Sequence, residues 1–212
     1  MLSSEKIKTG QLFIVAAPSG GGKTSLVNQL ILSMSNIELS ISHTTRPLRP
    51  KEKNGKDYFF VNHQVFESMA AQHLFLEHAK VFDNYYGTSK QQIDDRLENG
   101  TDIILDIDWQ GAQQIRMIIP EAVSIFLLPP SLQTLRERLQ NRQQDNQEVI
   151  EKRMQQAQAE LKHFSEFDYL IVNKEFDLAL HQLQAIVMAE RLKKNIQIQR
   201  ERKLLSFLLA TG

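Results

Sequence analysis

A glycine-rich stretch near the start of the chain has the residue types of a phosphate-binding loop, or P-loop. Between an apolar run and a segment with helical spacing, the chain reads Ala17-Pro18-Ser19-Gly20-Gly21-Gly22-Lys23-Thr24. Glycines let backbone N–H groups turn toward phosphate oxygens, and a helix start adds unpaired N–H groups. Lys23 then reaches nucleotide phosphates, and the Thr24 hydroxyl ligates Mg²⁺. Alanine can replace the first glycine if its φ is negative; the alternative is a turn without a ligand.

Two arginines follow in a segment rich in hydroxyl side chains, Ser42-His43-Thr44-Thr45-Arg46-Pro47-Leu48-Arg49. Guanidinium groups form bidentate, charge-assisted hydrogen bonds with phosphate or carboxylate, so Arg46 and Arg49 suit such a group. A solvated loop with incidental arginines explains the spacing equally well. Tyr58 could donate a hydrogen bond to a phosphate oxygen or simply pack at the start of a strand.

Glu77 has a specific chemistry only if the ligand is guanine. An isolated glutamate is ordinarily a surface residue. Guanine, however, presents adjacent N1–H and N2–H₂ donors that one carboxylate can accept together. Its O6 then needs a donor, which Ser42 or Thr88 could supply.

Two acids stand at the end of an apolar strand, Asp106 and Asp108. In P-loop proteins such an aspartate often lies near Mg²⁺; the alternative is that Asp108 caps a helix. Further along, Arg138 and Arg142 share one helix face, and Arg153 follows. Cations on a mobile segment can close over transferring phosphates, although a solvated helix face has the same appearance.

The elements that must position these residues alternate in type. Apolar runs predict buried strands at 12–16, 103–107, 123–128 and 169–172. Helices are predicted between and after them, with Ser89, Ser131 and Asn146 as N-caps, the last running to about 164, and another from 176 to about 194. This alternation indicates an α/β fold with a parallel sheet. Between 38 and 87, β-like pieces at 39–42, 58–61 and 74–81 predict an insert with its own small sheet.

Composition narrows the class of protein. The chain has 212 residues, with 25 basic and 25 acidic side chains and no cysteine. Disulfides and thiolate metal sites are therefore excluded, and zero net charge argues against a nucleic-acid partner. Without a secretory signal or a membrane-length apolar run, a cytoplasmic protein that does not contact the membrane is expected. The histidines have no ligand-like spacing, so no metal site of the protein's own is assigned.

The C-terminal segment combines basic and apolar residues. Residues 190–203 carry six basic and two acidic side chains, and five large apolar residues follow, Leu204, Leu205, Phe207, Leu208 and Leu209. We expect a solvated helix ending in a tail that packs on the core or contacts a second subunit. Nucleic-acid binding is the less favoured alternative.

In order and spacing, these segments resemble the guanylate kinase family, especially its bacterial members, over nearly the whole chain. The resemblance continues through Asn54-Gly55-Lys56-Asp57-Tyr58, Asn84-Tyr85-Tyr86-Gly87-Thr88, Leu105-Asp106-Ile107-Asp108-Trp109-Gln110-Gly111 and Tyr169-Leu170-Ile171-Val172-Asn173. It implies a P-loop NTPase fold in one domain, 1–212, with a parallel sheet flanked by helices. The core would comprise 1–42, 89–130 and 165–212, with a β-rich GMP-binding insert at 43–88 and an arginine-rich lid at 131–164.

The same resemblance implies the site residues. ATP would be bound, with Mg²⁺, by residues 17–25 and one asparagine: Ala17, Pro18, Ser19, Gly20, Gly21, Gly22, Lys23, Thr24, Ser25 and Asn173. GMP would be bound by Ser42, Arg46, Arg49, Glu52, Tyr58, Glu77, Tyr86, Thr88, Asp106 and Asp108. The catalytic cations would be Lys23, Arg46, Arg138, Arg142 and Arg153. Gln143, where the family usually has glycine, and Lys174, where an acid is common, depart from the pattern.

The implied reaction is transfer of the γ-phosphoryl group of ATP to GMP, or dGMP, without a covalent enzyme intermediate. Two other functions compete with it. One is a P-loop kinase acting on another phosphate acceptor, such as a ribose bisphosphate. The other is a catalytically inactive guanylate-kinase-like module that binds proteins. A homo-oligomer formed through the C-terminal tail is compatible with the implied reaction.

Overall fold

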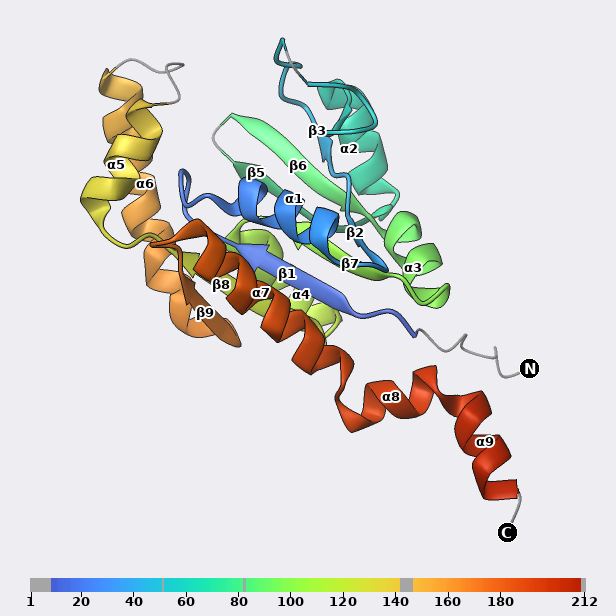
Figure 1. The fold of residues 1–212 in the computed structure, drawn as a ribbon. Coiled ribbons are helices and arrows are strands. Elements are labelled where there is room, and N and C mark those ends of the chain that lie inside the picture. Colours follow the sequence, from blue (N-terminus) through green and yellow to red (C-terminus); the bar gives the residue numbers. More distant parts are fainter. Residues whose placement is uncertain (1–8, 51, 82, 142–146, 211–212) are drawn as a thin grey trace.

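A parallel five-stranded sheet forms the centre of the molecule (Figure 1). The computed structural model describes residues 9–50, 52–81, 83–141 and 147–210. Across the sheet the strand order is β2 (Ile37–Leu39), β7 (Asp102–Asp106), β1 (Leu12–Ala16), β8 (Val123–Leu128) and β9 (Tyr169–Val172). Every neighbouring pair is parallel, which confirms the predicted α/β fold.

Alternate side chains of β1 enter two separate cores. Phe13 and Val15 pack with residues of α1 (Lys23–Ser33) and α7 (Phe176–Arg191) on one face. Leu12 and Ile14 pack with residues of α3 (Lys90–Glu98) and α4 (Trp109–Ile118) on the other. Because helices cover both faces, the strands are apolar along their whole length rather than alternating.

A second sheet, with one helix beside it, forms the insert. Its strand order is β4 (Phe59–Phe60), β3 (His43–Thr44), β6 (Asn84–Ser89) and β5 (Phe75–Val81), and the helix is α2 (His63–Ala71). The predicted small sheet is thus confirmed, but the predicted strand at 39–42 is wrong. Only Leu39 of that range is in a strand, as the last residue of β2, and residues 40–42 are in none. β2 pairs with β7 of the central sheet and buries Ile37 in the main core.

Two helices next to the P-loop have a small core of their own. They are α5 (Leu132–Gln140) and α6 (Gln147–Leu161), which pack through Leu135, Leu139, Ile150, Met154 and Ala157. Ser131 caps α5 as predicted, accepting from the Thr134 N–H at 3.0 Å. The predicted cap Asn146 lies outside the described residues. After α6 the chain tightens into the 3₁₀ helix η1 (Lys162–Glu166), so the α-helix ends before the predicted residue 164.

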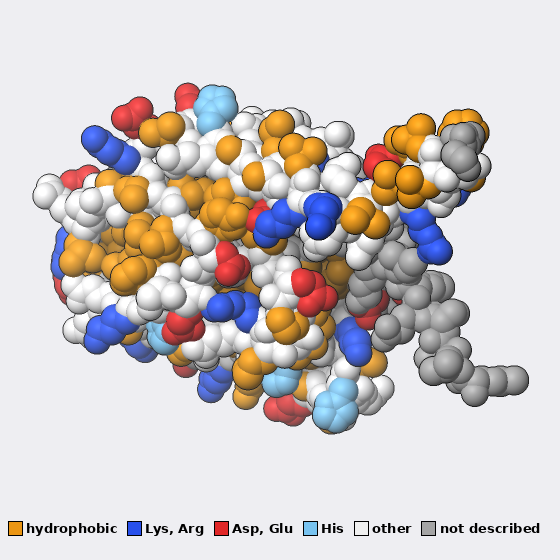
Figure 2. Space-filling view, turned by 90° about the horizontal axis from the view of Figure 1, so that it is seen from below, with side chains coloured by type: hydrophobic (Ala, Val, Ile, Leu, Met, Phe, Trp, Pro, Cys, Tyr) orange, Lys and Arg blue, Asp and Glu red, His pale blue; other side chains and the backbone are white. Residues whose placement is uncertain are grey.

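Two further sequence predictions about helix ends need correction. α3 begins after Ser89, but the Ser89 side chain makes no capping hydrogen bond. α7 ends at Arg191 rather than near 194, and the chain continues into α8 (Lys194–Arg200) and α9 (Arg202–Ala210). No residue of α9 is buried. The helix extends away from the body in Figure 1, and orange apolar side chains gather on it at the right of Figure 2.

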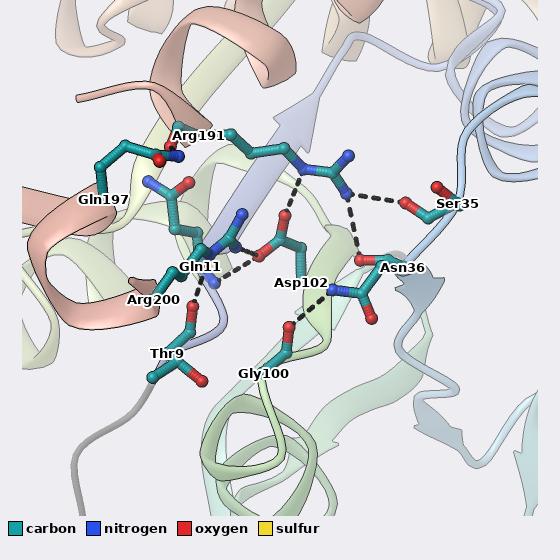
Figure 3. A network of polar contacts seen from close by, with 9 residues as sticks. All are labelled: Thr9, Gln11, Ser35, Asn36, Gly100, Asp102, Arg191, Gln197 and Arg200. Carbon is teal, nitrogen blue, oxygen red and sulfur yellow. Dashed lines mark hydrogen bonds and ion pairs between the residues drawn. The ribbon is translucent and has the colours of Figure 1, made fainter. Parts of the chain in front are cut away.

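A buried carboxylate fixes the start of this C-terminal extension (Figure 3). Asp102, with no exposed surface, pairs with Arg191 Nε of α7 at 2.7 Å and with Arg200 Nη2 of α8. It also accepts the Gln11 N–H at 2.7 Å, and Arg200 Nε donates to the Thr9 carbonyl at 2.9 Å. These contacts attach α7 and α8 to the amino-terminal ends of β1 and β7. None of the helices described is long and apolar enough to cross a membrane.

Candidate active site

A cavity of about 400 Å³ opens at the carboxyl ends of the parallel strands, where α/β proteins commonly bind ligands. It brings together most of the residues that the sequence singled out. From the P-loop side the lining includes Ala17, Pro18, Ser19, Gly20, Gly21, Gly22, Lys23, Thr24 and Ser25. From the insert and the sheet it includes Ser42, Arg46, Arg49, Tyr58, Glu77, Tyr86, Asp106 and Asp108, and Arg153 comes from α6.

The loop between β1 and α1 has the backbone conformation that its glycines permit. Gly20 and Gly22 have φ of +87° and +88°, a region that L side chains rarely adopt. A Cβ at Gly22 would also lie 2.5 Å from the Asn173 side-chain nitrogen. Ala17 is not among the described residues with positive φ, so the condition for alanine at the first P-loop position is met.

Lys23 and Thr24 meet the acid at the end of β7. Lys23 Nζ lies 2.8 Å from Asp106 Oδ1 and donates to the Ile107 carbonyl at 2.7 Å. Thr24 Oγ1 donates to Asp106 Oδ2 at 2.9 Å. The hydroxyl and the carboxylate are hard oxygen ligands of the kind Mg²⁺ prefers, so these residues fit the ion. The described residues contain no group of three or more His, Cys, Asp or Glu side chains able to hold a metal ion.

Asp108 has the structural role that the sequence left open as an alternative. Its Oδ1 accepts the Gly111 N–H at 2.9 Å and so caps α4. The same side chain also lines the cavity. Capping therefore does not remove Asp108 from the site.

Glu77 is a buried ionisable group in the cavity lining, with 4% of its surface exposed. Thr88 Oγ1 donates to Glu77 Oε1 at 2.6 Å. Burial raises the pKa of Glu77 to about 7. Ser42 lines the same cavity, whereas Thr88 is fully buried and does not. Thr88 thus orients the carboxylate, and its direct contact with a base stays a prediction.

Arg46 is held in place by a neighbouring acid. Its guanidinium donates to both carboxylate oxygens of Glu52, at 3.0 and 2.7 Å, and lies 5.5 Å from the centre of the Tyr58 ring. The hydrogen bond from Arg46 lowers the pKa of Glu52. Tyr58 in turn packs edge-on against Tyr86, with 5.9 Å between ring centres. Glu52 does not line the cavity, so the structure places it behind Arg46.

Two predicted residues lie beneath the P-loop rather than in the cavity. Asn173 Nδ2 donates to the Gly21 carbonyl at 2.8 Å. Arg138 Nη2 donates to the Asn173 carbonyl at 3.0 Å, and its Nη1 lies 3.5 Å from the Gly21 carbonyl. The contacts tie α5 and the end of β9 to the loop. Arg142, another predicted lid arginine, lies outside the described residues, as does Gln143.

Sequence reasoning missed Glu160. This residue of α6 lines the cavity, and its Oε2 accepts the Ser19 N–H of the P-loop at 3.1 Å. Burial raises the pKa of Glu160. Its position seven residues after Arg153, two helical turns along the same face, is the signal that could have revealed it.

Comparison with known proteins agrees with this geometry. A sequence model of the family described as guanylate kinase matches residues 9–190. The chain is 59% identical to guanylate kinase of Legionella pneumophila (strain Paris), covering 96% of this chain and 97% of that protein. It is 55% identical to guanylate kinase of Salmonella typhimurium, covering 95% and 98%. The crystal structure of guanylate kinase from Anaplasma phagocytophilum is similar, with a TM-score of 0.74 and 34% identity over 87% of this chain and 88% of that one.

Proposed function

The chain belongs to the guanylate kinase family, and we propose on that premise that it transfers the γ-phosphoryl group of ATP to GMP, giving ADP and GDP. The observation that carries this proposal is a single cavity bordered by the P-loop, a buried glutamate and two arginines of the insert. A kinase needs a donor site and an acceptor site in one space, so that the reacting groups meet without water.

The ATP phosphates would lie in the P-loop, where backbone N–H groups and Lys23 offset their charge. When bound, Mg²⁺ would draw negative charge from the phosphates, held by their oxygens and the Thr24 hydroxyl. The contact between Lys23 and Asp106 supports this assignment because it holds the ammonium group beside the loop. Asn173 would approach the adenine from beneath the loop.

GMP would occupy the side of the cavity formed by the insert. Its guanine would present N1–H and N2–H₂ to the Glu77 carboxylate, with Ser42 and Thr88 as the other predicted base contacts. Its phosphate would lie between Arg46, Arg49, Tyr58 and Tyr86. The bidentate hold of Glu52 on Arg46 supports this role, since it fixes the guanidinium at the cavity edge.

In the reaction, a phosphate oxygen of GMP attacks the γ-phosphorus of ATP, and the bond from that phosphorus to the ADP oxygen breaks. No protein nucleophile is needed. The protein aligns the two nucleotides and offsets charge on the transferring group through Lys23 and the lid arginines Arg138, Arg142 and Arg153. The insert (43–88) and the lid (131–164) would close on the core. Reduced hydrogen exchange in α5 and α6 with both nucleotides bound would test closure of the lid.

Calorimetric titration of GMP and AMP into the protein tests the acceptor assignment. We expect GMP to bind and AMP to bind far more weakly. Glu77→Gln should weaken GMP binding about ten- to a hundredfold, because its amide N–H₂ faces a guanine donor. Glu67→Gln, a matched change on the exposed face of α2, should leave binding unchanged. Equal affinity for GMP and AMP would contradict the guanine assignment.

We also propose that α9 contacts a second copy of this chain. The support is its apolar surface, with exposed fractions of 50%, 68%, 57% and 80% for Leu204, Phe207, Leu208 and Leu209. Light scattering on size-exclusion chromatography would detect the assembly, which Phe207→Ser should weaken. Leu32→Ser, at a leucine of α1 that is 80% exposed, should not. A monomer at all concentrations would contradict the proposal.

A cytoplasmic location stays a prediction.

A further inference from the structure

Helix α4 and strand β5 approach each other closely at Glu77, on the side of the cavity assigned to the guanine base. Gly111 is buried in the first turn of α4, and Glu77 is the buried acid of β5. A Cβ added at Gly111 would lie 2.7 Å from Glu77 Oε2 and 3.2 Å from Glu77 Cδ. Real Cβ atoms essentially never come within 3.0 Å of a heavy atom outside their own residue and its chain neighbours. A side chain at 111 and the present position of the carboxylate therefore exclude each other.

The backbone on both sides of this contact is held, so the two elements cannot easily separate. Gln114 of α4 accepts the His78 N–H at 3.1 Å and donates to the His78 carbonyl at 2.9 Å, next to Glu77 in β5. Asp108 fixes the first turn of α4 through the Gly111 N–H. The same Cβ would also stand 3.3 Å from Ile107 Cδ1. The end of the Glu77 side chain is therefore the part with the most freedom to yield.

A displaced Glu77 carboxylate would affect recognition before it affected folding. The Glu77 oxygen near Gly111 is Oε2, whereas Oε1 accepts the hydrogen bond from Thr88. Two guanine donors require both carboxylate oxygens at fixed positions, and a hydrogen bond weakens steeply when its geometry is lost. Gly111 has no positive φ, so alanine is compatible with its backbone and is the better helix former.

We propose that Gly111 is a specificity-determining residue: the absence of a side chain there leaves room for the Glu77 carboxylate in the position from which it reads the guanine of GMP. This inference rests on the proposed function, because it assigns Glu77 to the base of the acceptor. Gly111 touches no reacting atom and acts through Glu77, so it is a positioning residue.

Steady-state kinetics of Gly111→Ala test the inference. We expect the KM for GMP to rise about tenfold or more, the effect typical of one methyl group in a tight pocket. The KM for ATP should stay within about twofold, since the P-loop is untouched. The preference for GMP over IMP, which lacks the 2-amino group, should shrink. Met117→Ala, at an exposed position of the same helix, should behave as the wild type.

Combining Gly111→Ala with a second substitution, Glu77→Asp, distinguishes displacement of the Glu77 carboxylate from a general loss of structure. Glu77→Asp shortens the acid by one methylene, so its carboxylate no longer reaches the space beside position 111. In the Glu77→Asp protein, Gly111→Ala should then raise the KM for GMP little further. The inference would be overturned if Gly111→Ala raised the KM for GMP equally in the wild-type and Glu77→Asp backgrounds, or left it unchanged. It would also be overturned if Gly111→Ala failed to fold in both backgrounds. If the wild type does not phosphorylate GMP at all, the proposed function fails instead, which is a separate outcome.

Discussion

Lys23 is oriented by two oxygen acceptors, the Asp106 carboxylate at 2.8 Å and the Ile107 carbonyl at 2.7 Å. Such preorganisation places a positive charge at the P-loop without rearrangement during the reaction. We expect Lys23→Ala to lower kcat about 10²- to 10³-fold in a coupled assay of ADP formation. Lys152→Ala, which removes the same charge from an exposed position of α6, should leave kcat near the wild-type value. Full activity of Lys23→Ala would refute this role.

The buried Glu77 makes guanine binding depend on pH. Burial raises its pKa to about 7, and only the ionised form can accept two guanine donors. Affinity for guanosine, a ligand without a titrating phosphate, should therefore fall as the pH drops from about 8 to about 6. Calorimetry would measure this dependence, which Glu77→Gln should abolish. A dependence that persists in Glu77→Gln would assign it to another group.

The same raised pKa has a consequence for stability. The folded protein holds the Glu77 proton more tightly than the unfolded chain, whose value is near 4.5. The contribution of this group to the free energy of unfolding is thus present at low pH and declines as the pH rises from about 4.5 to about 7. At neutral pH, burial of Glu77 therefore serves binding of the guanine base and lowers the free energy of unfolding.

At the residue scale, the sequence predicted local chemistry better than contacts across the fold. The P-loop could be predicted because its residues are contiguous and its geometry depends on the glycines. The hydrogen bond from Thr88 to Glu77 joins residues 11 apart in the sequence, and the one from Asn173 to the Gly21 carbonyl joins residues 152 apart. Local sequence patterns do not reveal such pairs. Glu160 was missed for the same reason, since only folding brings α6 to the amide of Ser19.

At the scale of elements, α5 and α6 pack through a core of their own and carry Arg138 and Arg153, two of the three predicted lid arginines. Arg138→Ala and Arg153→Ala should each lower kcat, by about 10²-fold or more if each offsets charge on the transferring group. Arg136→Ala is the matched control, because this arginine of α5 pairs with Glu151 at the surface, where ion pairs contribute little. Its kcat should stay near the wild-type value in the same assay. If all three variants lose activity equally, the effect is on the fold of the lid.

The network around Asp102 holds the C-terminal helices (Figure 3). Asp102→Ala would leave Arg191, Arg200 and the Gln11 N–H without their buried acceptor. Loss of one partner from such a buried pair costs about 3–5 kcal/mol of the free energy of unfolding, measured by urea denaturation. Arg202→Ala, in the exposed α9, should cost little. An unchanged midpoint for Asp102→Ala would show that the network is not required for stability.

Element types were predictable where hydrophobic pattern and burial agree. The buried strands β1 and β8 lie where continuous apolar runs placed them, because both sheet faces are covered. The small strand β2 was assigned to the wrong sheet, since three residues carry no periodicity that identifies a partner. α2 was missed although Asn62 caps it, because only Phe66 of that helix is buried.

At the scale of the whole molecule, the cavity exists only because three parts of the chain meet. The P-loop and Asp106 come from the central sheet, Glu77 and Arg46 from the insert, and Arg153 and Glu160 from α6. None of these parts could bind both nucleotides alone. We therefore expect activity and base specificity to arise together in the intact chain.

The most direct test of this account is an assay of ADP formation by the purified protein with ATP and Mg²⁺. GMP, AMP, CMP, UMP and a ribose bisphosphate would be offered separately as acceptors. We expect strong turnover with GMP and little with any of the other four acceptors. Turnover confined to a different acceptor, or none from the folded protein, would contradict it.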